Sequence, residues 1–561
     1  MLRCLPAALA AVLLLPLPAR RELPRGAPSP ALAIVHARAY PMTAPGVRID
    51  DATLIVRDGR IAALGRRLPV PAGATVIDAR GRWLVPGLID AHVHCVDNPE
   101  IDFRLDLRHG ITTVFNLAGG VYHVDWRRRL AQGTMFGPSL LTTGPQMDGV
   151  PPEGTERAIV TTPLAGEASV ADQKRTGYDA VKVYSGLDVA TYDAIVDAAH
   201  RFGLRVIGHL PPKVGLAHAM AKRQAIAHAE ELLYAYQFDD DASVERAVRL
   251  VADARVPLTG TLVAYETIAK QIATLDGLRD APALRYVDAR VRAAWVRENG
   301  RYRSRFKPDR APRFAQLLAF QQRLIGKLDA AGVPIFVGTD ASTEVSGIPF
   351  DLPGFAYTRE IELLRAAGLT PAHLLDAATA AVPRWLGRSA EFGTLAPGSR
   401  ADALLIDRDP LADPSALTDP SLVVVRGASY TGEQLQREID DIPAMLARED
   451  RFLTAVRRDG AAPAIAALEA AHRADPARLQ VRQARLDSLA GDVLENNVAG
   501  GVALAELETR LIPDSADSWD TLGAAYRKAG DIARARVAYR RAVAMNPALD
   551  SSQDALDKLG R

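Results

Sequence analysis

The sequence predicts an α/β protein built around a (β/α)8 barrel, with a small β-sandwich assembled from both flanks and an all-α tail. Three observations predict this architecture. The chain has 561 residues, which at roughly 150 residues per domain suggests three or four domains. Apolar residues make up 48% and charged residues 24%, a balance typical of proteins with a large buried core. Short apolar runs alternate with helical stretches over residues 86–390, the pattern of strand–helix units around a parallel sheet.

The first element along the chain is an N-terminal targeting segment, residues 1–19. Residues 1–3 give a positive start, and residues 4–17 are almost wholly apolar. That run is too short to cross a bilayer of about 30 Å, and it fits the apolar region of a signal peptide. A disordered chain end is the alternative. Cleavage after Ala19 and cleavage after Ala33 both remain open, and we expect a secreted or periplasmic protein.

Two β-rich pieces flank the central section. Residues 32–85 and 391–430 both consist of short apolar runs separated by Gly, Asp and Pro, with turn dipeptides such as Asp58-Gly59 between them. We expect the two pieces to form one small sandwich.

The central section contains eight candidate strands, the number that a (β/α)8 barrel of about 300 residues requires. They are residues 88–94, 111–117, 139–144, 179–184, 204–209, 224–228, 257–263 and 333–339. A long, Arg-rich helical insert, residues 266–330, separates the last two strands. The insert is either a lid over the barrel mouth or a solvated decoration.

Residues 440–561 are rich in Ala, Arg and Leu and show helical periodicity without strands. Within them, residues 516–549 have the spacing of a tetratricopeptide repeat, in which large and small residues interlock between paired helices. Pro476 and Pro513 suggest two degenerate units upstream. A single repeat cannot bury its own apolar face, so neighbouring repeats are expected, and the tail could recruit a protein partner.

Charge and cysteine content exclude several classes of protein. The chain has 68 Lys and Arg against 67 Asp and Glu, whereas nucleic-acid-binding proteins normally have a basic excess. Two cysteines, Cys4 and Cys95, are too few for a disulfide scaffold or a cysteine-rich zinc module. After the N-terminal segment no run is long and apolar enough for a membrane span. We therefore expect a small-molecule substrate, no nucleic acid and no membrane span.

Metal-ligating residue types stand at the ends of several candidate strands. The first strand ends in His92 and His94, which share a face because side chains alternate along a strand. Two later strands end in His209 and His228, and the last ends in Asp340. Imidazole and carboxylate are common ligands of zinc, and active sites of barrels lie at the carboxyl ends of the strands. The sequence predicts a metal centre there.

Lys182 is the sixth candidate ligand. It alternates with Val181 and Val183, so it points into the barrel if the valines pack on the helices. Burial lowers the pKa of an ammonium group, and a neutral amine can take up CO2 to give a carbamate that bridges two cations. A lysine that reaches solvent at the strand end is the alternative.

Three further residues are candidates for contact with substrate. Tyr184 follows Lys182, Tyr265 follows the seventh strand, and His123 follows the second strand on the side of the barrel mouth. Packing roles for the tyrosines and a plain loop position for His123 are the alternatives.

Four sequence motifs carry a resemblance to a known family. Residues 83–94 read WLVPGLIDAHVH, residues 110–114 read GITTV, residues 337–340 read VGTD and residues 398–403 read GSRADA. Together they resemble the amidohydrolase superfamily, in particular the imidazolonepropionase-like amidohydrolases. The similarity covers residues 32–430 and excludes the tail.

The resemblance implies a binuclear centre, with zinc as the first expectation and manganese, cobalt or iron also acceptable to these ligands. One metal would be held by His92, His94 and Asp340, the other by His209 and His228, with carbamylated Lys182 as the bridge. The lysine points to the branch that contains proline dipeptidases. Phe115-Asn116 departs from the pattern, because relatives often carry Arg-Asp there.

The expected reaction is hydrolysis of an amide or peptide bond in a dipeptide, an N-acyl amino acid or a cyclic amide. A hydroxide that bridges two divalent metals attacks the carbonyl, and Asp340 serves as the general base. Lactone or ester hydrolysis at the same site is one alternative. A non-catalytic scaffold that acts through the repeat tail is another.

Overall fold

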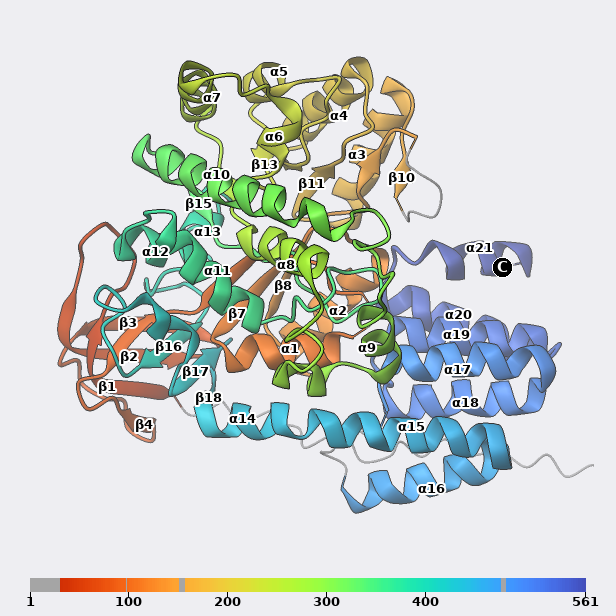
Figure 1. The fold of residues 1–561 in the computed structure, drawn as a ribbon. Helices are drawn as coiled ribbons and strands as arrows, with labels where there is room; N and C mark the ends of the chain where they lie inside the picture. Colours follow the sequence, from red (N-terminus) through yellow and green to blue (C-terminus); the bar gives the residue numbers. More distant parts are fainter. Residues whose placement is uncertain (1–30, 97, 151–156, 476–480, 561) are drawn as a thin grey trace, which may run out of the picture. The chain divides into compact units, whose positions relative to one another are not determined.

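The computed structural model describes residues 31–96, 98–150, 157–475 and 481–560. The expected signal peptide, residues 1–19, lies outside the described residues. The chain divides into two compact units, one within Pro28–Leu446 and one within Ala447–Arg561. Figure 1 shows the elements of each unit.

The two β-rich flanks form one sheet. Its strand order is β18-β17-β16-β5-β1-β2-β3, and β4 also pairs with β1. The flanks meet where β5 and β16 pair antiparallel, with Val85 opposite Leu404. Through this pairing the two flanks join in one continuous hydrogen-bonded sheet within the described chain. The strands are β1 (Leu32–Ala39), β2 (Ile49–Arg57), β3 (Arg60–Arg66), β4 (Thr75–Asp78), β5 (Trp83–Pro86), β16 (Ala403–Ile406), β17 (Leu422–Val425) and β18 (Ala428–Thr431).

All eight strands predicted for the central section are present, and each is shorter than its apolar run. Within the described residues, the strands of the central section pair only in parallel. They form two sheets, of order β6-β7-β8 and β10-β9-β11-β12-β13-β14-β15. Two short strands, β9 (Met147–Asp148) and β10 (Ala158–Ile159), were not predicted. The predicted eight are β6 (Leu88–Val93), β7 (Ile111–Asn116), β8 (Ser139–Thr142), β11 (Ala180–Val183), β12 (Arg205–Gly208), β13 (Ala225–Ile226), β14 (Leu258–Thr259) and β15 (Ile335–Phe336).

Two isolated parallel bridges connect the ends of these sheets. Thr143 pairs with Ala180 beyond β8, and Val93 pairs with Ala341 beyond β15. The backbone N–H of Ala91 also donates to the carbonyl of Val337 over 2.9 Å. The eight strands therefore follow one another in sequence order, and the segments after them leave from a common edge.

Helices connect successive strands and bury apolar faces against them. α7, for example, begins where the Asp240 carboxylate accepts from the Ser243 N–H over 2.7 Å, and its inner face carries buried Val248 and Val251. The remaining bounds are α1 (Pro99–Arg108), α2 (Val121–Gln132), α3 (Pro163–Thr176), α4 (Val189–Arg201), α5 (Leu216–Ala221), α6 (Glu231–Ala235), α7 (Asp241–Ala254), α8 (Leu262–Ala273), η1 (Pro282–Tyr286), α9 (Ala289–Trp295), η2 (Pro308–Arg310), α10 (Ala311–Ala330), α11 (Phe355–Ala366), α12 (Pro371–Ala378), α13 (Ala381–Leu386), η3 (Pro414–Thr418) and α14 (Gly432–Asp440).

The C-terminal region is helical, as the periodicity predicts. It comprises α15 (Ile442–Asp459), α16 (Ala461–Ala474), α17 (Gln483–Asn496), α18 (Val498–Leu511), α19 (Ala516–Lys528), α20 (Ile532–Met545) and α21 (Asp550–Lys558). A Cβ on Gly523 of α19 would stand 2.6 Å from the ring of Tyr539 on α20, so these two helices interlock a small residue with a large one. Among the described helices, none has the length and apolar character needed to cross a bilayer.

Candidate metal centre

The structure brings the six predicted ligands to the common edge where the strands end. His92 lies within β6 and His94 just after it, while Lys182 lies within β11. His209, His228 and Asp340 follow β12, β13 and β15 within four residues of each strand end. Parallel strands whose carboxyl ends share an edge place such residues side by side.

Three of the predicted ligands, His92, His94 and Asp340, lie close enough together to hold one metal ion. His92 Nε2 lies 3.2 Å from Asp340 Oδ1, and His94 Nε2 lies 2.8 Å from the same oxygen. The ligand atoms of these three residues all lie within 4.8 Å of one another. His92 is fully buried, and its Nε2 has no hydrogen-bond partner in the described chain. A buried ring nitrogen aimed at a carboxylate and a second imidazole fits a divalent cation.

The backbone of Asp340 is unusual. Its φ of 62° lies in the left-handed region, which costs a residue with a side chain about 1–3 kcal/mol. The Asp340 N–H donates to the carbonyl of His92 over 2.7 Å, which holds this turn. The turn brings the carboxylate back over the end of β6. The positive φ of Asp340 could not be predicted from the sequence, because a single aspartate after a strand carries no signal of this backbone conformation.

The second pair of imidazoles lies beside the first group. The ring centroids of His92 and His228 are 4.4 Å apart, and those of His209 and His228 are 5.1 Å apart. His228 Nδ1 contacts Thr261 Oγ1 at 3.0 Å, and His209 Nδ1 contacts Glu231 Oε1 at 2.9 Å. An Nδ1 engaged in this way leaves Nε2 for a metal, as in many metalloenzymes.

Glu231 is a functional residue that sequence reasoning missed. Burial alone would raise the pKa of its carboxyl, but the charge and hydrogen bond of His209 outweigh burial and lower it to about 2. Its second oxygen accepts from the Leu210 N–H over 2.8 Å. Glu231 thus contacts both the His209 ring and the backbone that follows β12. The one feature of the sequence that pointed to Glu231 was its position three residues after the ligand candidate His228.

Lys182 is buried at the centre of the group, with 1% of its surface exposed. Within the described chain its Nζ makes no hydrogen bond or ion pair. Burial lowers the pKa of this ammonium group to about 8. Its charge in turn contributes, after burial, to the lowered pKa values of His92 and His228. The side chain therefore points inward among the imidazoles, as the alternation with Val181 and Val183 predicts.

Asp90 ties the first and last strands together below the ligands. Its carboxylate accepts from the Thr339 hydroxyl over 2.7 Å and from the His92 N–H over 3.1 Å. Burial raises the pKa of Asp90 to about 7 despite these hydrogen bonds. Through Thr339 and His92, Asp90 sets the positions of two ligand-bearing segments.

The three candidates for substrate contact have different surroundings. Tyr184 stacks on the His209 ring at 3.8 Å and remains partly exposed. Tyr265 is 5% exposed and stacks on Phe314 at 5.5 Å. His123 is fully buried in α2, where its Nδ1 accepts from the Gly120 N–H over 2.9 Å and its Nε2 contacts the Cys95 carbonyl. Both ring nitrogens of His123 are engaged and the side chain is fully buried, which favours a structural role over contact with substrate.

The insert between β14 and β15 is fastened to the segment after Asp340. Trp295 Nε1 donates to the Glu344 carbonyl over 3.0 Å, and Arg301 Nη1 donates to the Gly347 carbonyl over 3.0 Å. Burial raises the pKa of Tyr302 in this insert to about 12, and the charge of Asp340 contributes to the shift. The insert therefore reaches the neighbourhood of the candidate centre.

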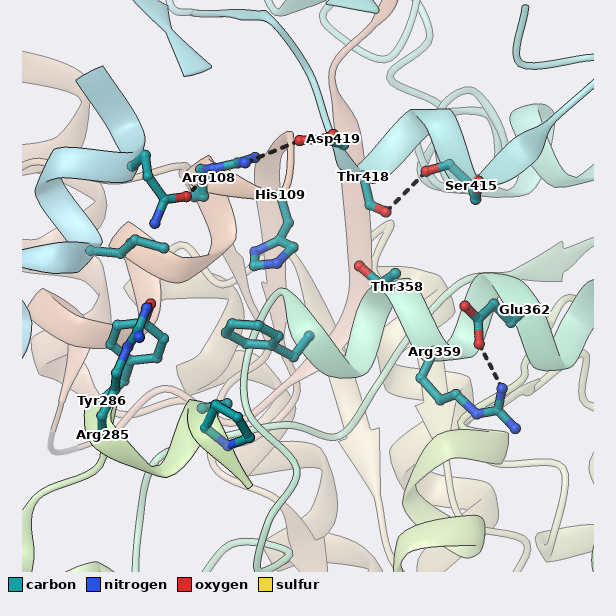
Figure 2. Close-up of a pocket in the computed structure, with 15 residues that line it drawn as sticks. Arg108, His109, Arg285, Tyr286, Thr358, Arg359, Glu362, Ser415, Thr418 and Asp419 are labelled. Carbon is teal, nitrogen blue, oxygen red and sulfur yellow. Dashed lines mark hydrogen bonds and ion pairs between the residues drawn. The ribbon is translucent and has the colours of Figure 1, made fainter. Parts of the chain in front are cut away.

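A separate cavity of about 630 Å³ contains none of the six ligands (Figure 2). It lies among α1, η1, α11, η3 and α14. Its arginines already have partners: Arg108 pairs with Asp419 at 3.0 Å, and Arg359 pairs with Glu362 at 2.6 Å. Its size alone does not make it the site of the chemistry.

Comparisons with known proteins find similar sequences and similar folds. The sequence model described as the amidohydrolase family matches residues 83–429. An imidazolonepropionase of Ralstonia nicotianae is 28% identical over 401 residues, which span 64% of this chain and 88% of that protein. The structure of a bottromycin amidohydrolase is 26% identical, with a TM-score of 0.60, and the match covers 74% of this chain and 90% of that one. A Xaa-Pro dipeptidase structure with bound methionine shares the fold at 18% identity and a TM-score of 0.54, over 72% of this chain and all of that one.

Proposed function

This chain belongs to the amidohydrolase family, and we propose that it cleaves an amide or peptide bond in a small substrate with the help of divalent metal ions. Membership makes it a hydrolase of carbon–nitrogen bonds. The substrates that we propose are dipeptides, N-acyl amino acids and cyclic amides. The observation that carries the proposal is the convergence of His92, His94 and Asp340 with two further imidazoles and a buried lysine.

We assign the ligands to two metal positions. His92, His94 and Asp340 would hold one metal, and His209 and His228 would hold the other. Lys182 would supply a carbamate as a further oxygen ligand. Zinc is the first choice, although manganese, cobalt and iron accept the same ligands. When bound, two such cations lower the pKa of a water molecule between them and polarise the substrate carbonyl.

The chain's own residues supply the proton transfers and the positioning. Asp340 would accept a proton from the attacking water and pass it to the leaving amine nitrogen. Lys182, with a pKa near 8, has a neutral amine fraction at physiological pH that can react with CO2 and release a proton. Glu231 and Thr261 orient His209 and His228 through their Nδ1 atoms.

We propose the following organisation around this site. Residues 86–390 form a (β/α)8 barrel, which the parallel order of the strands and the two bridges support. Residues 32–85 and 391–430 form the flanking β domain. Residues 440–561 form tetratricopeptide-like repeats, which the Gly523–Tyr539 interlock supports.

Export is a separate proposal that rests on residues 1–19 alone. N-terminal sequencing of the protein recovered from outside the cytoplasm tests it. A mature N-terminus near residue 20 or residue 34 supports export, and an intact Met1 in that fraction contradicts cleavage.

The activity test is a substrate panel. Protein that contains two zinc equivalents is assayed against dipeptides, N-acyl amino acids, hydantoins and lactones. Cleavage of one amide class supports the proposal. Cleavage of lactones alone favours the esterase alternative, and failure on the whole panel contradicts both.

The tail has its own test. A variant without residues 447–561 that keeps the wild-type kinetics but no longer binds a partner marks the tail as an interaction module. A variant that precipitates marks it as part of the fold.

A further inference from the structure

An arginine stands beside the candidate centre, next to a short strand that the sequence did not predict. Arg157 lies immediately before β10, and its guanidinium carbon is 3.5 Å from the ring centroid of Tyr184. The Tyr184 ring in turn stacks on His209, with centroids 3.8 Å apart and planes 25° apart. Arginine, tyrosine and metal-ligand candidate thus form one continuous stack.

The guanidinium is held from one side only. Arg157 Nη1 donates to Asp148 Oδ2 over 2.8 Å, and Asp148 is 2% exposed. The other oxygen of Asp148 accepts from the N–H groups of Gly149 and Gly186, at 2.9 Å and 2.6 Å. The two remaining groups of Arg157, Nε and Nη2, make no hydrogen bond within the described part of the chain. With 16% of the side chain exposed, Arg157 is oriented and keeps donors available.

The positive charge of Arg157 affects the pKa values of Lys182 and Tyr184. Burial is the main cause of the lowered pKa of Lys182, and the charge of Arg157 contributes in the same direction. Arg157 also opposes the rise in the pKa of Tyr184 that burial causes. Arg157 is therefore a cation close to two of the candidate ligands, Lys182 and His209.

We propose that Arg157 binds a carboxylate of the substrate, so that the preferred substrates are amides of amino acids with a free carboxyl group. A planar guanidinium whose Nε and Nη2 have no partner among the described residues matches a carboxylate in a forked geometry, and the Tyr184 ring stacks against the guanidinium. This inference rests on the proposed function and narrows it. Dipeptides and N-acyl amino acids fit, whereas uncharged cyclic amides and lactones leave the cation without a partner.

The test compares one acid with its neutral counterpart. N-acetylphenylalanine and N-acetylphenylalaninamide contain the same acetyl amide bond, and acetate release is measured for both with the zinc-loaded protein. For Arg157→Gln we expect kcat/KM on the acid to fall ~100-fold, mainly through KM, because truncation of a buried charge pair typically costs that much. The rate on the amide should change by less than about threefold. Arg157→Lys, which keeps the charge but not the fork, should recover part of the loss.

A matched control is Arg128→Gln. Arg128 also pairs with a buried aspartate, Asp125, at 2.6 Å, but it belongs to α2 and has no part in the stack. This variant should treat the two substrates as the wild type does. If Arg157→Gln instead loses the same factor on acid and amide, the stack only positions His209 and the proposal is overturned.

Failure of the proposed function is distinguishable from failure of this inference. If the wild type cleaves neither compound, calorimetry measures the binding of both to the wild type and to Arg157→Gln. Tighter binding of the acid that is lost in the variant supports the carboxylate site without any turnover. Equal binding of acid and amide, or binding of neither, overturns it.

Discussion

The backbone N–H of Asp340 donates to the carbonyl oxygen of His92 over 2.7 Å, and this bond joins the end of the last strand to the end of the first. The positive φ of Asp340 and the hydrogen bonds of Asp90 serve the same junction. The imidazoles of β6 and the carboxylate after β15 are therefore positioned by backbone contacts that do not depend on a bound ion.

The first prediction concerns Asp340→Asn. The amide keeps the size of the side chain but cannot accept a proton, so kcat should fall by roughly 10²–10⁴. Circular dichroism should show an unchanged fold, because the backbone bond to His92 remains. A variant with an undiminished rate would remove Asp340 from proton transfer.

The second prediction concerns Lys182→Met. Methionine fills the buried space but cannot form a carbamate, so metal content measured by mass spectrometry should fall from about two ions per chain to about one. In the wild type, withholding CO2 and bicarbonate during metal loading should have the same effect, and adding bicarbonate should reverse it. Two ions bound regardless of bicarbonate and of Lys182 would contradict the carbamate assignment.

Much of the candidate centre could be predicted from the sequence because its six ligand candidates lie at or near the ends of five separate apolar runs. The alternation of Lys182 with two valines indicated its direction, and the structure places it inward. The positions of Glu231 and Arg157 could not be predicted in this way. Glu231 is the first residue of the short helix α6, and Arg157 comes immediately before a strand of two residues, which is too short to leave a periodic pattern.

The surroundings of His123 could not be predicted from the sequence. Its place after the second strand suggested the barrel mouth, but the chain turns directly into α2 and buries the ring against Cys95 and Gly120. A sequence gives the end of a strand more reliably than the path of the residues that follow it.

The third prediction follows from this burial. Burial lowers the pKa of His123 to about 4, against about 6.5 in an unfolded chain. Between these values the unfolded chain binds a proton that the folded chain does not, so the free energy of unfolding falls as the pH drops from about 6.5 to about 4. The loss from this group is roughly 3 kcal/mol over that window.

Denaturant unfolding at about pH 7 and about pH 4.5 measures this effect. His123→Gln should show a smaller pH dependence than the wild type. An equal pH dependence in the variant and the wild type would show that His123 is not the titrating group.

The fourth prediction compares two glycines in helices of the tail. A Cβ at Gly523 would lie 2.6 Å from the Tyr539 ring, whereas a Cβ at Gly491 meets nothing within 4 Å. Gly523→Ala should destabilise the tail by about 1–3 kcal/mol through overpacking. Gly491→Ala should stabilise it by up to about 1 kcal/mol, because alanine favours the helix.

Thermal unfolding followed by circular dichroism measures both variants, and neither should change kcat. Equal stability of the two variants would contradict the close interlock of α19 and α20.

The central claim is that these side chains hold two metal ions, and anomalous X-ray scattering from crystals grown with zinc tests it most directly. We predict one peak among His92, His94 and Asp340 and a second beside His209 and His228, with Lys182 between them. The absence of any peak within reach of these imidazoles would contradict the account.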